Sequence, residues 1–253
     1  MTQIVEIKTE SELKSLREAG KLVSEILSVI KSKVQAGIST KELDDIAYKS
    51  VVSHNAAPAF LGYRGYPSTT CISINNELVH GIPAHKKNLQ DGDIVSIDIG
   101  IKYNGFYGDV AQTVAVGKIS ESRKKLMKTG YNCFLESLKY CYKQYRVGDI
   151  SHSIQRYAET NGYSVIRDFV GHTIGRNLHE KPDIPNFGQA GTGPRLYPGM
   201  VIAIEPMIAE GIWKVKILQD GWTVIMQDGK DCVHFEHMVE ITDSEPRVLT
   251  SYN

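Results

Sequence analysis

The sequence predicts an α+β protein built from two similar halves. In each half, two helical patterns precede the strand patterns, an order typical of α+β proteins. Residues 89–98 (LQDGDIVSID) and 196–205 (LYPGMVIAIE) share Leu, Gly, a penultimate Ile and a terminal carboxylate. The Gly37-Ile38-Ser39 segment and its following helix likewise resemble Gly148-Asp149-Ile150 and the helix after it. Two halves around a pseudo-twofold axis would bring Asp98 and Glu205 to related central positions, unless the similarity is accidental.

Composition excludes several classes of protein. The 253 residues are 42% hydrophobic and 23% charged, as in an ordinary globular protein. The net charge is zero, so nothing in the bulk charge favours binding to DNA or to an anionic membrane. No apolar run reaches the length of a transmembrane helix.

The amino-terminal segment and the cysteines predict a cytoplasmic location. Residues 1–21 carry charges of both signs and lack the apolar core of a signal peptide. The cysteines at positions 71, 133, 141 and 232 form no CxxC pair, and we expect them to be reduced thiols.

In the first half, helical periodicity predicts a helix over residues 10–35, opened by Thr9 and Glu12 at capping-box spacing. Ser39 and Glu42 repeat that signal and open a second helix that ends near residue 54. Residues 57–66 lack periodicity and predict a loop. Strands are expected over 70–74, 94–101 and 106–116, with Asn104-Gly105 as the hairpin turn between the last two.

In the second half, a helix is expected over residues 121–145. A further helix over 150–160 has Asp149 as its predicted N-cap and Asn161-Gly162 as its stop. Strand patterns cover residues 164–169, 201–204, 222–226 and 234–241.

Four carboxylates and one imidazole stand in stretches that otherwise read as strands or Gly-flanked turns: Asp98, Asp109, His172, Glu205 and Glu236. A carboxylate in an apolar run is costly to bury unless a cation compensates its charge. We therefore predict a metal site that the fold assembles, and a metal site suggests hydrolysis. A ligand set of oxygens with one imidazole suits Mn²⁺, Fe²⁺ or Co²⁺, and Zn²⁺ is compatible with it.

The hairpin supplies the geometric argument for two ions. A turn at Asn104-Gly105 pairs Asp98 with Ala111, so Asp109 lies diagonally across from Asp98 on the same face. Such neighbours are roughly 7–8 Å apart, which suits carboxylates that hold two cations about 3.5–4 Å apart. A turn centred one residue earlier would place the two aspartates directly opposite. Two solvent-facing acids on an edge hairpin are the alternative.

Two further segments carry the remaining ligands. In GHTIGRNLHE, residues 171–180, the spacing of the two histidines favours one metal ligand and one residue that either supports a ligand or faces the substrate. In VHFEH, residues 233–237, alternation places Glu236 on the face opposite Phe235, and Pro206 stops strand pairing directly after Glu205.

The stretches IDIG, GFYGDVAQT, GHTIG, LHEKP, IEPM, DGWTV and FEH resemble, in this order and spacing, the methionine aminopeptidases. The resemblance runs over residues 5–250 and implies the pita-bread fold, with two layers and a central curved antiparallel sheet. It implies one domain over residues 1–253, with halves of about 10–117 and 118–250. The similarity is to the type I subclass found in bacteria and organelles, and the zinc-binding amino-terminal extension of eukaryotic cytosolic relatives is expected to be absent.

The resemblance implies removal of the initiator methionine from nascent chains whose second residue is small. Asp98, Asp109, His172, Glu205 and Glu236 would hold two divalent ions, with Co²⁺, Mn²⁺ or Fe²⁺ expected and Zn²⁺ or Ni²⁺ also compatible. Water between two such ions would attack the first peptide carbonyl, with Glu205 as proton shuttle. His179 would donate to the carbonyl oxygen, and His80 would contact the side of the scissile amide nitrogen.

The same resemblance implies a pocket for the methionine side chain, drawn from Tyr63, Tyr66, Cys71, Met207 and Trp222. Aromatic rings suit a flexible thioether. Three residues depart from the family pattern: Phe60 replaces a small residue, Leu178 a Phe, and Thr173 a Gly. The volume changes at Phe60 and Leu178 partly offset each other, and the departures put pocket shape and turnover in doubt.

The expected partners are nascent polypeptides that begin with Met, and the protein is expected to be a monomer. A basic cluster of Arg123, Lys124, Lys125 and Lys128, extended by Lys139, Lys143 and Arg146, suggests transient docking to ribosomal RNA; a solvated helix face is the alternative.

Two rival functions remain at this point. One is a proline-directed peptidase of the same fold, such as aminopeptidase P or prolidase, although those proteins usually carry a large amino-terminal domain. The other is a pita-bread binding module without catalysis, although such relatives usually lose ligands.

Overall fold

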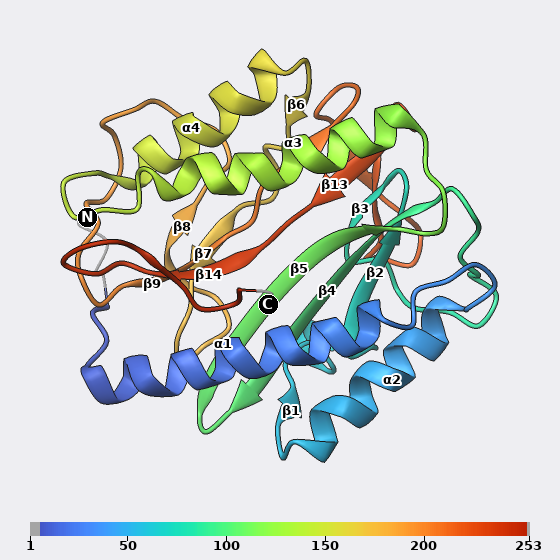
Figure 1. Ribbon diagram of the computed structural model, residues 1–253, viewed down its shortest axis with the longest axis horizontal. Coiled ribbons are helices and arrows are strands. Elements are labelled where there is room, and N and C mark those ends of the chain that lie inside the picture. Colours follow the sequence, from blue (N-terminus) through green and yellow to red (C-terminus); the bar gives the residue numbers. More distant parts are fainter. Residues whose placement is uncertain (1–5, 252–253) are drawn as a thin grey trace.

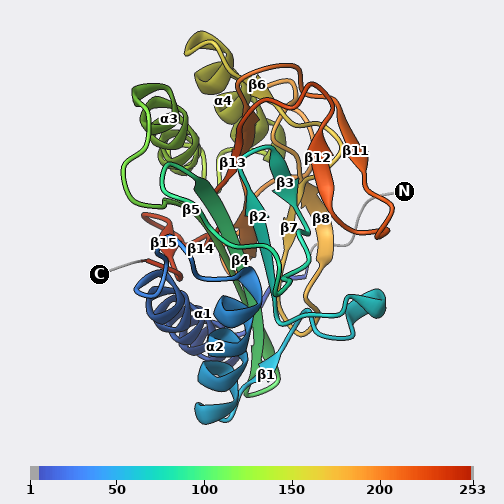
Figure 2. The same cartoon turned by 90° about the vertical axis from the view of Figure 1, so that its right-hand side faces the viewer.

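The computed structural model describes residues 6–251; residues 1–5, which belong to the segment predicted to contain no signal peptide, and residues 252–253 lie outside it. It contains two pairs of helices and a set of antiparallel sheets between them (Figures 1 and 2). The helices are α1 (Glu10–Lys31), α2 (Thr40–Ser53), α3 (Glu121–Leu138) and α4 (Val147–Thr160). Among the described residues, no helix is both long and apolar enough to cross a bilayer.

Both predicted capping boxes are confirmed. Thr9 accepts a hydrogen bond from the Glu12 amide, and the Glu12 carboxylate accepts one from the Thr9 amide at 2.9 Å. Ser39 and Glu42 repeat this exchange at the start of α2. Each box satisfies amides that have no partner within the helix.

Three predicted helix boundaries are wrong. The helix α1 ends at Lys31, so residues 32–35 leave the helix although Val34 continues the apolar period. The helix α3 ends at Leu138, seven residues early. The helix α4 begins at Val147 with Arg146 as N-cap, and the Asp149 carboxylate accepts a hydrogen bond from the Arg146 amide at 2.8 Å. Asp149 is therefore the third residue of α4 and not its N-cap. The predicted end of this helix at Asn161-Gly162 is confirmed.

The first sheet carries the predicted hairpin. Its strands are β1 (Ala57–Pro58), β2 (Thr70–Ile74), β4 (Ile94–Tyr103) and β5 (Phe106–Ala115). Asn104 and Gly105 both have positive φ, as a two-residue hairpin turn requires. The register pairs Asp98 with Ala111 and Gly100 with Asp109, so the predicted diagonal relation between the two aspartates is confirmed.

The loop predicted over residues 57–66 contains more order than expected. It holds β1 and the short 3-10 helix η1 (Tyr63–Gly65). Gly62 and Gly65 have positive φ, and Arg64 between them also does. These turns carry Tyr63 and Arg64 to the wall of the cavity described below.

The other strands form three sheets. A five-stranded sheet has the order β15-β14-β9-β7-β8, and two smaller sheets have the orders β13-β10-β6 and β11-β12-β3. Their bounds are β3 (Glu77–Val79), β6 (Ser164–Val165), β7 (Gly171–Thr173), β8 (Glu180–Ile184), β9 (Val201–Ile204), β10 (Met207–Ala209), β11 (Val215–Ile217), β12 (Val224–Met226), β13 (Cys232–His234), β14 (His237–Glu240) and β15 (Arg247–Val248).

Several predicted strands are shorter than expected. The pattern over 164–169 forms a strand only at Ser164–Val165. Trp222 and Thr223 precede β12 in a turn, because the Asp220 carboxylate accepts hydrogen bonds from both amides at 2.9 Å. The stretch 234–241 is split at Phe235-Glu236, where Glu236 bridges to Ala111 of β5. That bridge joins Glu236 to the strand that carries Asp109.

The hydrophobic core contains two large clusters, one beside each helix pair. One joins α1 and α2 to β2, β4 and β5, and includes Leu27, Leu43 and Ile97. The other joins α3 and α4 to strands of the second half, and includes Phe134, Ile154 and Ile204. This arrangement supports the prediction of two similar halves, with the acidic strands between them (Figure 1).

Candidate metal and peptide site

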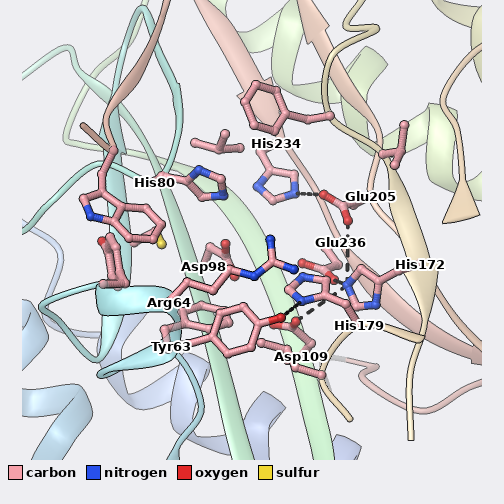
Figure 3. Close-up of a pocket in the computed structure, with 18 of the residues that line it drawn as sticks. Tyr63, Arg64, His80, Asp98, Asp109, His172, His179, Glu205, His234 and Glu236 are labelled. Atoms are coloured by element: carbon pink, nitrogen blue, oxygen red, sulfur yellow. Dashed lines mark hydrogen bonds and ion pairs between the residues drawn. The ribbon is translucent and has the colours of Figure 1, made fainter. Parts of the chain in front are cut away.

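A cavity of about 330 Å³ lies between the two halves and is lined by residues on strands and loops of both. It is lined by all five predicted metal ligands and by His80, His179, Phe60, Tyr63, Tyr66, Cys71 and Trp222. Figure 3 shows these carboxylates and imidazoles turned toward a common centre. The fold therefore gathers residues that are more than one hundred positions apart.

The tightest group is Asp109, His172 and Glu236, whose ligand atoms all lie within 4.8 Å of one another. The Nε2 atom of His172 lies 3.9 Å from Asp109 Oδ2, 3.8 Å from Glu205 Oε1 and 3.8 Å from Glu236 Oε1. Asp98 faces the same cavity from β4, outside this tight group.

The protonation of His172 follows from its neighbours. Its Nδ1 lies 3.1 Å from the Thr173 carbonyl oxygen, which can only accept a hydrogen bond. The proton is therefore on Nδ1, and the Nε2 lone pair faces the carboxylates. A lone pair directed at three carboxylates is repulsive unless a cation lies between them, and a histidine held in this way is typical of metal ligands.

Buried carboxylate oxygens without partners support the same conclusion. Among the described residues, Asp98 Oδ1, Asp109 Oδ1 and Glu236 Oε1 are buried and accept no hydrogen bond. An unpaired buried charge is strongly unfavourable, and a divalent ion would supply the missing partner. The residues present therefore fit a metal centre.

Without a cation, the carboxyl groups resist ionisation. Burial raises the pKa of Asp98 to about 7. Burial and the neighbouring Asp98 raise the pKa of Asp109, while burial and then Asp109 raise that of Glu236. Burial lowers the pKa of His172 to about 3, so this ring stays neutral and able to donate its lone pair.

The two predicted substrate-facing histidines lie on opposite sides of the cavity. His179 is exposed, and its Nδ1 lies 2.9 Å from the Tyr63 hydroxyl. His80 packs edge-on against Phe169 and faces Trp222. Its φ of 58° is rare for a residue with a side chain, and such strain is concentrated at functional positions.

The predicted pocket residues do not all line the cavity. Tyr66 is 3% exposed and packs edge-on against Trp222 at 5.1 Å between ring centroids. Met207, however, is fully buried in a core cluster with Leu78 and Val224, and it is not among the lining residues.

The three departures from the family pattern differ in their surroundings. Phe60 and Leu178 both line the cavity and belong to the same apolar cluster. Thr173 instead donates a hydrogen bond from its buried hydroxyl to the Pro182 carbonyl at 2.7 Å, and it does not line the cavity. Its side chain therefore ties β7 to β8.

Sequence reasoning missed several lining residues: Arg64, Val79, Asp168, Phe169, Val170 and His234. Of these, His234 could have been found, because strand alternation puts it on the same side as Glu236. Arg64 could not, since its position depends on the irregular turn around η1.

Comparison with known proteins identifies the family. The family model of metallopeptidase family M24 matches residues 14–243. The chain is 49% identical to a methionine aminopeptidase of Clostridium perfringens, over 96% of this chain and 98% of that protein. It is 48% identical to methionine aminopeptidase 1 of Bacillus subtilis, over 96% and 98%.

Solved structures agree with the sequence comparisons. A methionine aminopeptidase from Thermotoga maritima superposes with a TM-score of 0.96 at 42% identity, covering 98% of this chain and 100% of that chain. A prolidase from Pyrococcus furiosus reaches 0.79 at 22% identity, covering 98% of this chain and 66% of that chain, which shows a shared fold alone. The predicted α+β pita-bread fold is thereby confirmed, and the type I subclass fits the bacterial relatives. The chain belongs to metallopeptidase family M24 and, within it, to the methionine aminopeptidases.

Proposed function

We propose that the protein uses this cavity to remove the amino-terminal methionine of peptides and nascent proteins whose second residue is small. The observation that carries this proposal is the group of His172 and the three carboxylates of Asp109, Glu205 and Glu236 around one point, in a cavity with aromatic walls. All five predicted ligands line that cavity, which argues against a binding module that has lost its catalytic residues.

The metal centre is proposed to hold two divalent ions, with Co²⁺, Mn²⁺ or Fe²⁺ expected and Zn²⁺ or Ni²⁺ compatible. Asp109, His172 and Glu236 lie close enough to share one ion. Asp98, across the hairpin from Asp109, would extend the site to a second ion, and Glu205 would contribute from the side of His172. Such ions supply hydroxide near neutral pH by lowering the pKa of bound water.

The protein side chains would orient the peptide and move its protons. Glu205 would take the proton of the attacking water and deliver it to the leaving amine. His179, steadied by Tyr63, would donate a hydrogen bond to the carbonyl oxygen as negative charge develops on it. His80 would face the scissile amide as a neutral ring. Burial and the nearby His234 lower its pKa to about 4, so it carries no charge near neutral pH.

The methionine side chain would lie among Phe60, Tyr63, Tyr66, Cys71 and Trp222. The S···aromatic contacts of a thioether suit this wall. Met207 would act through the core beneath the pocket, because it does not line the cavity.

The cellular setting is proposed to be cytoplasmic, with the protein working as a monomer on nascent chains. Two of the basic residues on α3 that could contact ribosomal RNA already form ion pairs within the protein. Arg123 pairs with Asp231 at 2.7 Å, and Lys124 pairs with Glu121 at 2.6 Å. Transient rather than tight association is therefore the proposal.

The activity is tested with two peptides of equal length, Met-Ala-Ser and an Xaa-Pro tripeptide, incubated with the Mn²⁺-loaded protein. We expect release of free methionine and no cleavage before proline. Cleavage of the Xaa-Pro peptide alone would assign the chain to the proline-directed rival. Inactivity toward both with every candidate divalent ion would contradict the enzymatic proposal.

A further inference from the structure

His234, the last residue of β13, lines the cavity together with His80, His172 and His179, and the proposed mechanism gives it no role. Only 2% of it is exposed. It lies two residues before Glu236 and, in Figure 3, faces Glu205 across the upper part of the cavity. A buried polar ring in this place needs an explanation.

The backbone of His234 is fixed on both sides by one hydroxyl group. Its amide donates to Thr113 Oγ1 at 3.0 Å, and Thr113 Oγ1 donates to its carbonyl oxygen at 2.9 Å. The single proton of Thr113 is thus committed, so Ser96 must be the donor in the buried 2.7 Å contact between the two hydroxyls. This arrangement anchors His234 to the hairpin that carries Asp98 and Asp109.

The ring itself, by contrast, has no hydrogen bond among the described residues. Both Nδ1 and Nε2 are buried without a partner. Neither nitrogen is used to stabilise the fold, and leaving both unpaired is costly. Unpaired buried polar atoms in a site wall indicate a functional constraint.

Among the described residues, Glu205 is the carboxylate that approaches this ring within 4 Å. Its Oε2 lies 3.5 Å from His234 Nε2, while its other oxygen, Oε1, lies 3.8 Å from His172 Nε2. The carboxylate therefore lies between two imidazoles, one near each oxygen. The backbone of Glu205 is fixed as well, because its carbonyl accepts a hydrogen bond from Asn186 Nδ2 at 2.9 Å.

We infer that His234 is a positioning residue for Glu205: its Nε2–H faces Oε2 and turns the carboxylate so that Oε1 stays with the metal ligands. This inference rests on the proposed role of Glu205 as ligand and proton shuttle. The same carboxylate must serve a metal with one oxygen and a moving proton with the other, so its rotation has to be restricted. A partner of this kind typically changes metal affinity or activity 10–100-fold when it is removed.

The test compares His234→Leu with His234→Gln. Leucine has a similar volume and cannot donate a hydrogen bond, whereas the glutamine amide can donate toward Oε2. For His234→Leu we expect a kcat on Met-Ala-Ser that is roughly 10–100-fold lower, a KM within about threefold of the parent value, and Mn²⁺ binding by calorimetry that is weaker by a similar factor. His234→Gln should recover a large part of both losses.

A double-mutant cycle on Mn²⁺ affinity shows whether His234 acts through Glu205. If it does, His234→Leu weakens Mn²⁺ binding in the parent protein but has little further effect in Glu205→Gln. Additive losses would overturn the inference, as would an unchanged kcat and Mn²⁺ affinity in His234→Leu, or an effect confined to KM.

Two controls separate this inference from other failures. The melting temperature of metal-free His234→Leu should not fall, because the substitution removes two unpaired buried polar atoms. If that variant does not fold, kcat and Mn²⁺ affinity are measured in His234→Gln alone. Values near those of the parent support the inference, and a full loss of both contradicts it. If the parent protein releases no methionine with any ion, the proposed function fails, whereas the calorimetric cycle still decides the relation between His234 and Glu205.

Discussion

At the scale of single residues, the proposed metal centre depends on buried carboxylates whose charge a cation would balance. Asp98 shows this clearly, since it faces the cavity, lies diagonal to Asp109 and has a buried oxygen with no hydrogen-bond partner among residues 6–251. Its replacement should therefore affect the chemistry before it affects the fold.

We expect Asp98→Asn to lower kcat/KM on Met-Ala-Ser by more than about 100-fold, because removal of a direct ligand should exceed the loss seen for supporting residues. The measurement is methionine release at saturating Mn²⁺, with circular dichroism as the check on folding. Near-parent activity in a folded Asp98→Asn protein would remove Asp98 from the centre.

The pocket offers a second prediction, at Gly100. A Cβ built on this glycine would lie 2.6 Å from the ring of Phe60, so the ring occupies the space that a side chain would need. We expect Gly100→Ala to push Phe60 toward the cavity and to raise KM for Met-Ala-Ser about tenfold, since small displacements near a site are costly.

The matched control is the double variant Gly100→Ala with Phe60→Cys. It should recover most of the loss, because the smaller side chain frees the space. If KM is equally high with and without Phe60, the ring is not the cause, and the contact of the new methyl group with Ala59 at 3.0 Å would explain the effect instead.

At the scale of elements, the hairpin of β4 and β5 holds the two aspartates in register. Both turn residues have positive φ, 49° for Asn104 and 84° for Gly105. We expect Gly105→Val to lower the free energy of unfolding by about 1–2 kcal/mol, since a β-branched residue is strained in this conformation. Urea titration measures the change.

The control at the same turn is Asn104→Asp, because Asp-Gly also forms this type of turn. It should change the free energy of unfolding by less than about 0.5 kcal/mol. Equal destabilisation by both variants would show that the turn conformation is not what sets the stability of the hairpin.

The elements also show how far the sequence alone can lead. Long patterns with specific end signals were sufficient: the capping boxes at Thr9 and Ser39 and the turn at Asn104-Gly105 are all confirmed. Strands of two to five residues, such as β7 and β8, are too short to show a period. Where α3 ends, no Gly or Pro follows Leu138, so the sequence carries no signal for that boundary.

Some residues of the site could likewise be predicted from the sequence pattern, and others could not. Apolar runs identified the five acidic or imidazole residues, because a carboxylate within such a run is conspicuous. His80, His179 and the pocket aromatics required the family resemblance, since a lone histidine or tyrosine has no distinguishing pattern. Met207, which the resemblance implied for the pocket, is buried in a core cluster and does not line the cavity.

At the scale of the whole molecule, the buried acidic residues make the stability of the metal-free protein depend on pH. The pKa of Asp98, raised by burial to about 7, lies above its value of 3.8 in the unfolded chain. The folded metal-free protein thus binds more protons than the unfolded chain between about pH 4 and pH 7. The free energy of unfolding contributed by this group falls as pH rises through that range.

Asp98→Asn removes this effect, because the amide does not ionise. Relative to the parent, the metal-free variant should gain stability as pH rises from 5 to 8. With saturating Mn²⁺ the parent should be the more stable of the two proteins, since the ion stabilises the folded state of the protein that binds it fully. Melting temperatures at the two pH values, with and without Mn²⁺, give the comparison, and a difference between the proteins that stays constant with pH would contradict it.

In the proposed function, the five residues bind two divalent ions, and this centre cleaves after an amino-terminal methionine. The most direct measurement is a titration of metal-stripped protein with Mn²⁺, in which calorimetric stoichiometry and methionine release from Met-Ala-Ser are followed in parallel. We expect two ions per chain in the parent, loss of at least one in Asp98→Asn, and activity that appears only as the sites fill. Full activity in the metal-stripped protein, or a parent that binds Mn²⁺ and releases no methionine with any divalent ion, would contradict it.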